Sequence, residues 1–198
     1  MFDKTGTLTE DGITIHGIKI NQGNFKISQK STFKEEQKGL EYYIYENENY
    51  LDYNNAFIEV LACCHSVTLI KGQLMGDPLE IEMFECSGWT LIENSISNEI
   101  VAMLRATETD QISQIEIVKR FNFESKLMRS SVIAKKSSND IYRSFVKGSP
   151  EKLLELCLSE TIPDDFHQIL DQYTFEGYRV IALASKILPN VKSFKDAN

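Results

Sequence analysis

The stretch between residues 113 and 147 constrains the fold most, because it holds three consecutive candidate strands with short connections. Residues 113–123 alternate apolar and polar side chains, which is the period of a half-buried strand. Residues 130–135 and 141–147 follow as two more strands, and the connection between them is rich in turn-forming residues. Short connections join antiparallel neighbours, whereas parallel strands need crossovers of about a dozen residues or more. The sequence therefore predicts an antiparallel sheet.

Four helices are predicted around these strands. Apolar residues at i, i+3, i+4 and i+7 predict helices over 52–65 and 164–176. Two more helices begin at Pro78 and Pro150, because each proline follows a capping residue and suits the first helical position.

The other segments complete the predicted order. Further strands are predicted over 13–30, 67–75, 89–93 and 178–185. Residues 31–50 are interpreted as a surface loop with a short strand or edge segment, and residues 94–112 as a loop that can contain a helical turn. The predicted order is strands, two helices, strands, two helices and a final strand. This order predicts an α+β domain, an antiparallel β-sheet flanked by helices.

Composition limits the function classes. The 198 residues are 42% apolar, enough for a core, and the net charge of −8 argues against a nucleic-acid binder. The four cysteines lack metal-type spacing, and we expect reduced, buried thiols in a cytosol-facing domain. The chain contains no run of about twenty apolar residues, the length of a transmembrane helix.

The chain opens on residues 3–9, DKTGTLT, directly after Phe2. If Phe2 ends a buried strand, Asp3 lies at its C-terminal tip, where open α/β sheets keep reactive groups. A carboxylate there can attack a phosphoryl group and form an aspartyl phosphate. The alternative is an N-terminal loop rich in threonine.

This string resembles the phosphorylation motif of the P-type ATPases, membrane pumps that cycle through a phosphorylated aspartate. Residues 10–12, EDG, resemble the type V branch. The resemblance implies that Asp3 is the nucleophile, that Thr5 supports it, and that Mg²⁺ binds Asp3 and the Thr5 backbone carbonyl in the full-length protein. Related phosphatases carry an acid at the Thr5 position, which activates water. Its absence should let the acyl phosphate persist, as a pump requires.

Later segments resemble the nucleotide-binding domain of the same pumps, in the family's order. They are CCHS at 63–66 with GDPLE at 76–80, FNFES at 121–125, KGSPE at 147–151 and GYRVIALA at 177–184. The resemblance implies that Glu80 accepts a hydrogen bond from the adenine amino group and that Phe123 stacks on the base. It also implies nucleotide-binding roles, chiefly at the phosphates or ribose, for Arg129, Lys147, Gly148 and Arg179.

Most of these residues also have a structural alternative. Glu80 completes a capping box, and Phe123 could belong to the core together with Phe121. Lys147 could be a surface lysine, and Arg179 could form a strand-edge salt bridge.

Two positions leave further alternatives open. Many relatives have a basic residue where Met128 stands, so the phosphate role passes to Arg129, with Lys126 as a weaker candidate. For His65 a structural role is the better interpretation, either as a cation at a helix C-terminus or as a packed core histidine.

The expected organisation has three parts. Residues 1–12 form the first strand and phosphorylation loop of the P domain, 13–186 the nucleotide-binding domain, and 187–198 a linker back to the P domain. Met1 directly before Phe2 suggests a partial gene product.

The parent is expected to be a type V cation-transporting ATPase in an endomembrane or a lysosome- or vacuole-like membrane, with this domain in the cytosol. ATP and Mg²⁺ are its expected cofactors, and the rest of the pump its partner in cis. The chain alone, a monomer, should bind nucleotide without completing the cycle. The alternatives are a stand-alone phosphatase of the same superfamily as the pumps that uses Asp3, and a non-catalytic interaction module.

Overall fold

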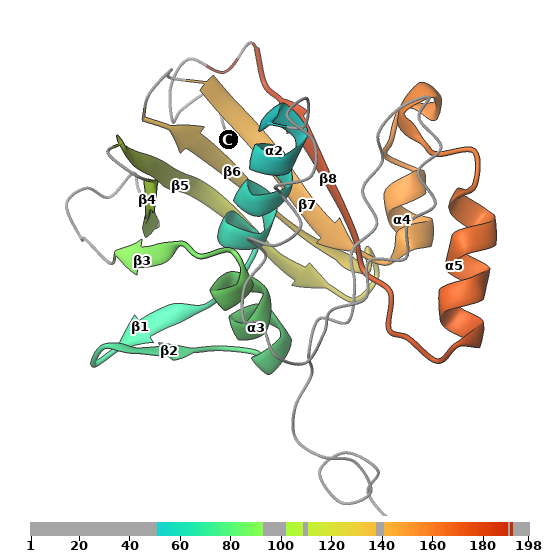
Figure 1. Cartoon of the computed structure of the whole chain (residues 1–198), viewed down its shortest axis with the longest axis horizontal. Coiled ribbons are helices and arrows are strands. Elements are labelled where there is room, and N and C mark those ends of the chain that lie inside the picture. The colour runs from blue at the N-terminus through green and yellow to red at the C-terminus, as the bar shows by residue number, and fades with distance from the viewer. Residues whose placement is uncertain (1–50, 93–101, 109–110, 138–140, 190, 192–198) are drawn as a thin grey trace, which may run out of the picture.

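The computed structural model of the chain describes residues 51–92, 102–108, 111–137, 141–189 and 191 (Figure 1). The predicted strands over 13–30, the predicted loop over 31–50 and the motif containing Asp3 and Thr5 lie outside these residues. The proposed boundary between residues 12 and 13 lies outside them too.

The centre of the described fold is a six-stranded antiparallel sheet. Its strands neighbour one another in chain order. They are β3 (Thr90–Ile92), β4 (Ala102–Glu108), β5 (Gln111–Glu124), β6 (Arg129–Lys136), β7 (Ile141–Gly148) and β8 (Ala182–Ile187). The predicted α+β class with an antiparallel sheet is confirmed.

The prediction of a loop over 94–112 is wrong for residues 102–108, which form β4, and for 111–112, which begin β5. Alanine and charged residues give β4 little alternation. Its partner supplies the missing signal, because Ala102 pairs with Ile117 and Leu104 with Ile115 in the register. Tertiary pairing here overrides weak local propensity.

One face of the sheet is covered by α2 (Leu51–Cys63), which packs on β7 and β8 and against α3 (Pro78–Cys86). The core lies between these helices and the sheet, where burying apolar side chains supplies most of the stabilisation. Its most buried members include Val60, Cys63, Phe84, Ile115, Ile117 and Phe145.

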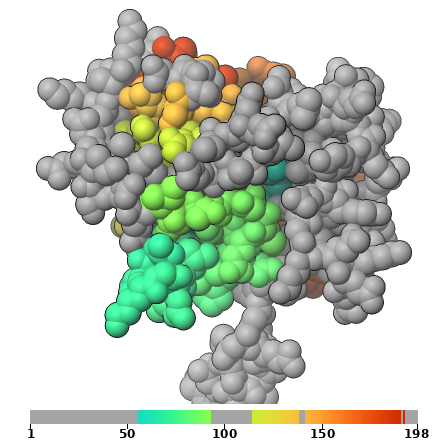
Figure 2. Space-filling view, turned by 60° about the vertical axis from the view of Figure 1, so that its left-hand side comes forward, coloured from blue at the N-terminus to red at the C-terminus, as the bar shows by residue number. Residues whose placement is uncertain are grey.

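A hairpin of β1 (Thr68–Ile70) and β2 (Gln73–Met75) joins the two helices. Its turn residues Lys71 and Gly72 have φ values of 51° and 80°, and two successive positive values suit a two-residue hairpin turn. Figure 2 shows this hairpin projecting from the molecule beside the residues of α3 and β3.

The C-terminal part contains α4 (Pro150–Leu154), a 3₁₀ turn (Ser159–Thr161) and α5 (Phe166–Phe175). In Figure 1 α4 and α5 stand together at the end of β7. The predicted final strand over 178–185 is shifted, because β8 begins only at Ala182. Gly177, with φ of 87°, ends α5, and the Tyr178 backbone N–H still donates to Tyr173 O, so residues after the helix first complete its cap.

Candidate functional site

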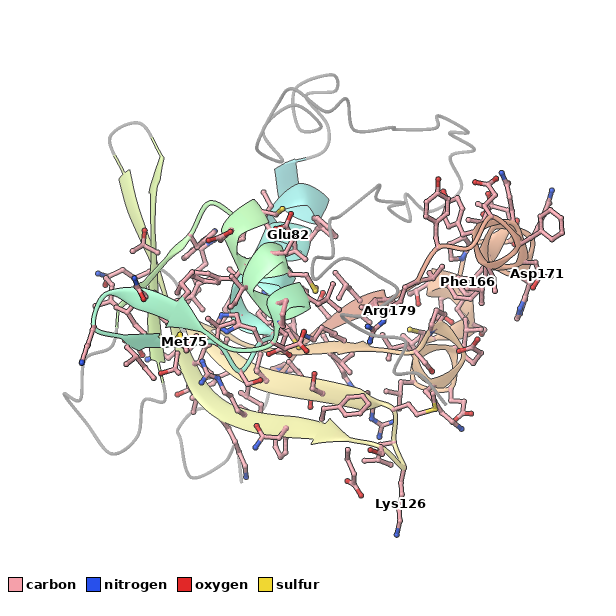
Figure 3. All side chains as sticks on the ribbon, turned by 90° about the horizontal axis from the view of Figure 1, so that it is seen from below. Met75, Glu82, Lys126, Phe166, Asp171 and Arg179 are labelled. Carbon is pink, nitrogen blue, oxygen red and sulfur yellow. The ribbon has the colours of Figure 1, made fainter. Side chains whose placement is uncertain are left out.

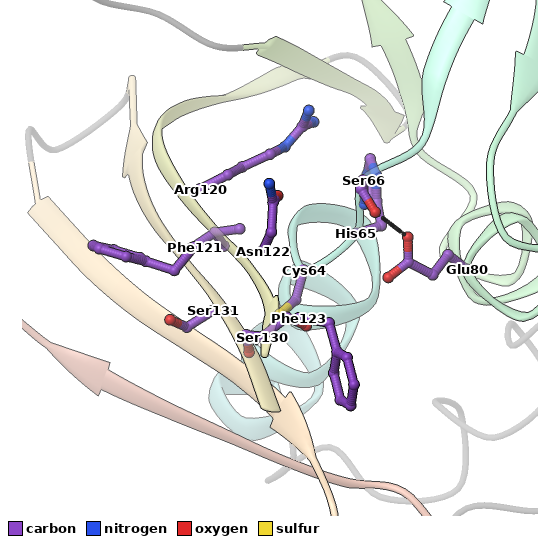
Figure 4. A pocket seen from close by; sticks show the side chains of 11 residues that line it. Cys64, His65, Ser66, Glu80, Arg120, Phe121, Asn122, Phe123, Ser130 and Ser131 are labelled. Carbon is purple, nitrogen blue, oxygen red and sulfur yellow. Dashed lines mark hydrogen bonds between the residues drawn. The ribbon is translucent and has the colours of Figure 1, made fainter. Parts of the chain in front are cut away.

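A shallow pocket, open to solvent, lies where the end of α2 and the start of α3 face β5 and β6 (Figure 4). Its hollow measures about 250 Å³ when the open solvent at its mouth is included. Its walls are residues 64–66, Glu80, residues 120–123 and residues 130–132. These segments are far apart in the chain and meet only through the fold.

Glu80 enters the pocket from the first turn of α3. That helix begins as predicted, with Pro78 in the first position and the Asp77 carboxylate accepting the Leu79 N–H at 2.9 Å. The Glu80 carboxylate binds residues outside α3 instead of the helix cap. Its Oε2 accepts the backbone N–H of Ser66 at 2.8 Å and the Ser66 hydroxyl at 2.6 Å. Its Oε1 accepts the ammonium of Lys147 at 2.7 Å.

These contacts keep Glu80 ionised. Burial alone would raise the pKa of its carboxyl, but the hydrogen bonds from Lys147 and Ser66 outweigh burial and lower the pKa below its usual value. An ionised carboxylate can only accept hydrogen bonds. Glu80 therefore offers the pocket an acceptor.

Lys147 is not a surface lysine, because its side chain is only 9% exposed. It lies near the end of β7 and donates to Glu80, whose side chain is 14% exposed. A buried ammonium requires such a partner, since desolvation of an unpaired charge is costly. The structure thus joins two predicted site residues that are 67 positions apart.

Gly148 is required by the neighbouring strand. A Cβ at this position would stand 2.5 Å from Met128 O and 2.7 Å from Arg129 Cβ, which is too close for any side chain. Met128 itself has φ of 49°, a left-handed conformation that is uncommon for residues with a side chain. Its carbonyl accepts the Ser149 N–H at 3.0 Å. The β5–β6 hairpin is therefore held tightly against the start of α4.

Phe123 is 63% exposed and Phe121 is also exposed, so the alternative that both rings are core is wrong. Both line the pocket, and Figure 4 shows the rings pointing in different directions. The pairing of β5 with β6 is irregular between Phe121 and Glu124, and such irregularities redirect side chains. The Lys119 ammonium lies 5.0 Å from the centre of the Phe121 ring. Phe123 is the more exposed apolar surface of the pocket.

The predicted arginines lie away from the pocket walls. Arg129 opens β6 opposite Gly148 and is half-buried. Arg179 is exposed and precedes β8, on the α4–α5 side in Figure 3. Figure 3 places Lys126 at the outer tip of the β5–β6 hairpin. The structure thus brings together Glu80, Phe123 and Lys147, while Asp3 and Thr5 lie outside the described residues.

His65 is a packed, neutral histidine. Its Nδ1 accepts the Val67 backbone N–H at 3.1 Å, so Nε2 carries the proton and donates to Ala62 O at 2.6 Å. Its ring meets Phe84 edge-on at 4.8 Å. Burial and the nearby Arg120 charge lower the pKa of His65 to about 4. The packed-core interpretation is confirmed, and the alternative of a helix-terminal cation is wrong.

Ser66 and Arg120 are among the pocket residues that sequence reasoning did not single out. Ser66 belongs to the CCHS segment but carries no chemistry that would single it out. Arg120 directly precedes the aromatic pair on β5, and only the fold brings its charge beside His65.

The described cysteines are all free, and Cys63 and Cys64 are buried. Burial raises the pKa of Cys64 to about 11 and that of Cys63 well above its usual value, so both remain thiols at neutral pH. Within the described ranges, no group of three or more metal-ligating side chains occurs. No helix in those ranges is long and apolar enough to cross a membrane.

Comparisons with known proteins agree with this fold. Residues 54–198 match the family model described as P-type ATPase, cytoplasmic domain N. The chain is 35% identical over 223 residues to the vacuolar cation-transporting ATPase YPK9 of Saccharomyces cerevisiae, with 95% of this chain and 15% of that protein covered. It is 34% identical over 212 residues to the polyamine-transporting ATPase 13A3 of Mus musculus, with 94% and 16% covered. It is 33% identical over 210 residues to the polyamine-transporting ATPase 13A2 of Homo sapiens, with 99% and 16% covered. The chain thus spans about a sixth of the length of these relatives.

Proposed function

Because this chain belongs to the P-type ATPase family, in its type V branch, we propose that its pocket binds ATP for a membrane pump. The observation that carries the proposal is the pairing of an exposed ring with an ionised acid. Phe123 offers a flat apolar surface, and Glu80 beside it offers an acceptor fixed by Ser66 and Lys147.

Adenine suits this pair in two ways. Its faces stack on an aromatic ring, and stacking of a base on such a ring is worth about 1–3 kcal/mol. Its amino group donates a hydrogen bond, which the Glu80 carboxylate can accept. The base would therefore lie over Phe123 with its amino edge toward Glu80.

With the base in this position, the phosphates would extend toward the cationic residues of this chain that lie in or near the motif segments. We propose Arg129 and Arg179 for phosphate or ribose contacts. Gly148 keeps the backbone at this end of β7 close to its neighbour. Lys147 is held by Glu80, so we propose that it acts at the base end, and a phosphate would have to compete with Glu80 for its ammonium.

In the full-length pump we propose that ATP phosphorylates Asp3, with Thr5 in support, and that this step drives transport. The Asp3 carboxylate and the Thr5 carbonyl are oxygen donors of the kind that Mg²⁺ prefers, and the ion would offset phosphate charge there. The relatives' names point to a cation or a polyamine as cargo, and one of them to a vacuolar membrane. We propose an endomembrane pump with this domain, a monomer, on the cytosolic side.

A titration of the chain with ATP, followed by backbone amide chemical shifts, tests the proposal. Shift changes are expected around Phe123, Glu80 and Lys147. Phe123→Ala should weaken ATP binding about tenfold or more, through lost stacking, and Lys147→Ala should weaken it less. Phe175→Ala removes an exposed ring on α5 and is the matched control, which should bind ATP normally.

Shift changes clustered elsewhere would overturn the site. The chain should also take up no radiolabel from ATP at Asp3, and clear labelling would favour the alternative of a self-contained phosphatase. A chain that binds no nucleotide would favour the interaction module.

A further inference from the structure

Ser66 directs both of its donors at one oxygen of Glu80. The backbone N–H lies 2.8 Å and the hydroxyl 2.6 Å from Oε2. A carboxylate has roughly four acceptor sites, two on each oxygen. Ser66 takes both sites on Oε2 and Lys147 takes one on Oε1, so a single acceptor site on Oε1 remains for a ligand.

The backbone around Ser66 is fixed by its neighbours. His65 is bound on both ring nitrogens, to Ala62 O at the end of α2 and to the Val67 N–H. The Cys64 thiol lies 3.7 Å from Ser130 O and 3.9 Å from Phe145 O, on strands β6 and β7. The segment that presents Ser66 is therefore anchored to the helix and to the sheet at once.

Ser66 itself is exposed and its side chain belongs to no core cluster. Figure 4 shows it between His65 and Glu80 at the pocket, with its bond to Glu80 drawn. A serine in this position adds little to the core, and its two bonds instead decide how the carboxylate is turned.

From this arrangement we infer that Ser66 is a positioning residue that sets the purine selectivity of the pocket. The inference rests on the proposed nucleotide-binding function. With Oε2 held by Ser66, Glu80 presents Oε1 as a pure acceptor. A 6-amino purine donates to it, whereas a 6-oxo purine brings an acceptor of its own to the same place.

Mismatched acceptors are poorly tolerated, because buried polar groups then remain unpaired. Without the Ser66 hydroxyl, Oε2 keeps only the bond from the Ser66 backbone N–H, and the carboxylate is freer to rotate about its last bond. A rotated carboxylate no longer aims its free acceptor site at the amino group, so ATP loses a hydrogen bond that GTP does not make.

The test compares the affinities of the chain for ATP and GTP by calorimetry. The wild-type chain should prefer ATP. Ser66→Ala should weaken ATP binding about fivefold while GTP binding changes little, so the ATP:GTP ratio contracts about fivefold. Ser66→Thr keeps the hydroxyl and should restore the ratio.

Ser159→Ala is the matched control. The Ser159 hydroxyl also contacts a carboxylate, that of Glu160 at 3.4 Å, but outside the pocket, and its loss should leave the ratio unchanged. If Ser66→Ala does not fold, Ser66→Cys, whose thiol is a weak donor, replaces it with the same expected contraction.

The remaining outcomes separate this inference from the proposed function. Equal weakening of ATP and GTP by Ser66→Ala would overturn the positioning role, since a general structural defect does not choose between bases. A wild-type chain that binds ATP and GTP equally would overturn the inference and leave nucleotide binding intact. A wild-type chain that binds neither would overturn both.

Discussion

Two glutamates of this domain form ion pairs with the sheet, and they differ in what surrounds them. Glu59, on α2, contacts Lys136 at 2.9 Å and Arg143 at 3.4 Å. Its side chain is 4% exposed, and its two cations reach it from more open positions on β6 and β7. Glu80 contacts one cation, Lys147, which is the more buried member of the pair.

The difference lies in the acceptor capacity that is left over. Glu59 lies under its helix, away from the pocket walls, and each of its oxygens faces a protein cation. Glu80 lines a hollow and keeps an acceptor site toward it. An ion pair between a glutamate and a basic residue therefore holds α2 on the sheet at Glu59, whereas at Glu80 it orients an acceptor for a ligand.

The largest expected effect breaks the first pair. Glu59→Gln removes the charge that Lys136 and Arg143 share and turns a buried amide NH2 toward one of them, and such a mispaired buried group costs about 1–3 kcal/mol. Urea unfolding should show this loss, whereas the ATP affinity of the folded variant should match that of the wild type. A drop in ATP affinity like that of a Glu80 variant would contradict the distinction between the two sites.

Acid should destabilise the fold through His65, which directly precedes Ser66 at the Glu80 site. Because the folded-state pKa of His65 is lowered to about 4, from an ordinary value of 6.5, the unfolded chain binds a proton first as the pH falls. Stability should fall between about pH 6.5 and pH 4, by up to about 3 kcal/mol from this group. The slope of unfolding free energy against pH measures it, and His65→Gln should remove it; an unchanged slope in that variant would assign the loss to other groups.

The third change, Glu80→Gln, should lower the free energy of unfolding less than the first two changes and should lower the ATP affinity more. Glu80→Gln leaves Lys147 with a neutral partner, which should cost about 1–2 kcal/mol of unfolding free energy. It also replaces a pure acceptor with an amide, so ATP affinity should fall about tenfold while GTP is affected less. Calorimetry with both nucleotides checks this, and an unchanged ATP affinity would place the base elsewhere.

Much of the fold follows from local pattern. The alternation in 113–123 predicts β5, and the Pro78 and Pro150 starts predict α3 and α4, because the signals for these elements lie within a few neighbouring residues. The sequence predicts a loop where β4 lies. This prediction fails because the extended conformation of β4 depends on pairing with β5 and not on its own residues.

The site is predictable only in part. Phe123, Glu80 and Lys147 stand out because their segments resemble family motifs. The bond between Glu80 and Lys147 could not be predicted, since 67 residues separate them and only the fold, in which α2 packs on both α3 and β7, joins them. Ser66 and Arg120 have no local signature, because their roles come from what the fold places next to them.

The close contact at Gly148 links the β5–β6 side of this pocket to the start of α4. Any Cβ at Gly148 would collide with Met128 and Arg129. The hairpin that carries Phe123 is therefore in direct backbone contact with the start of α4, and the two move together. A displacement of α4 would therefore also move the hairpin that carries Phe123. The position of the pocket wall that carries Phe123 is thus set by how closely two backbones can approach.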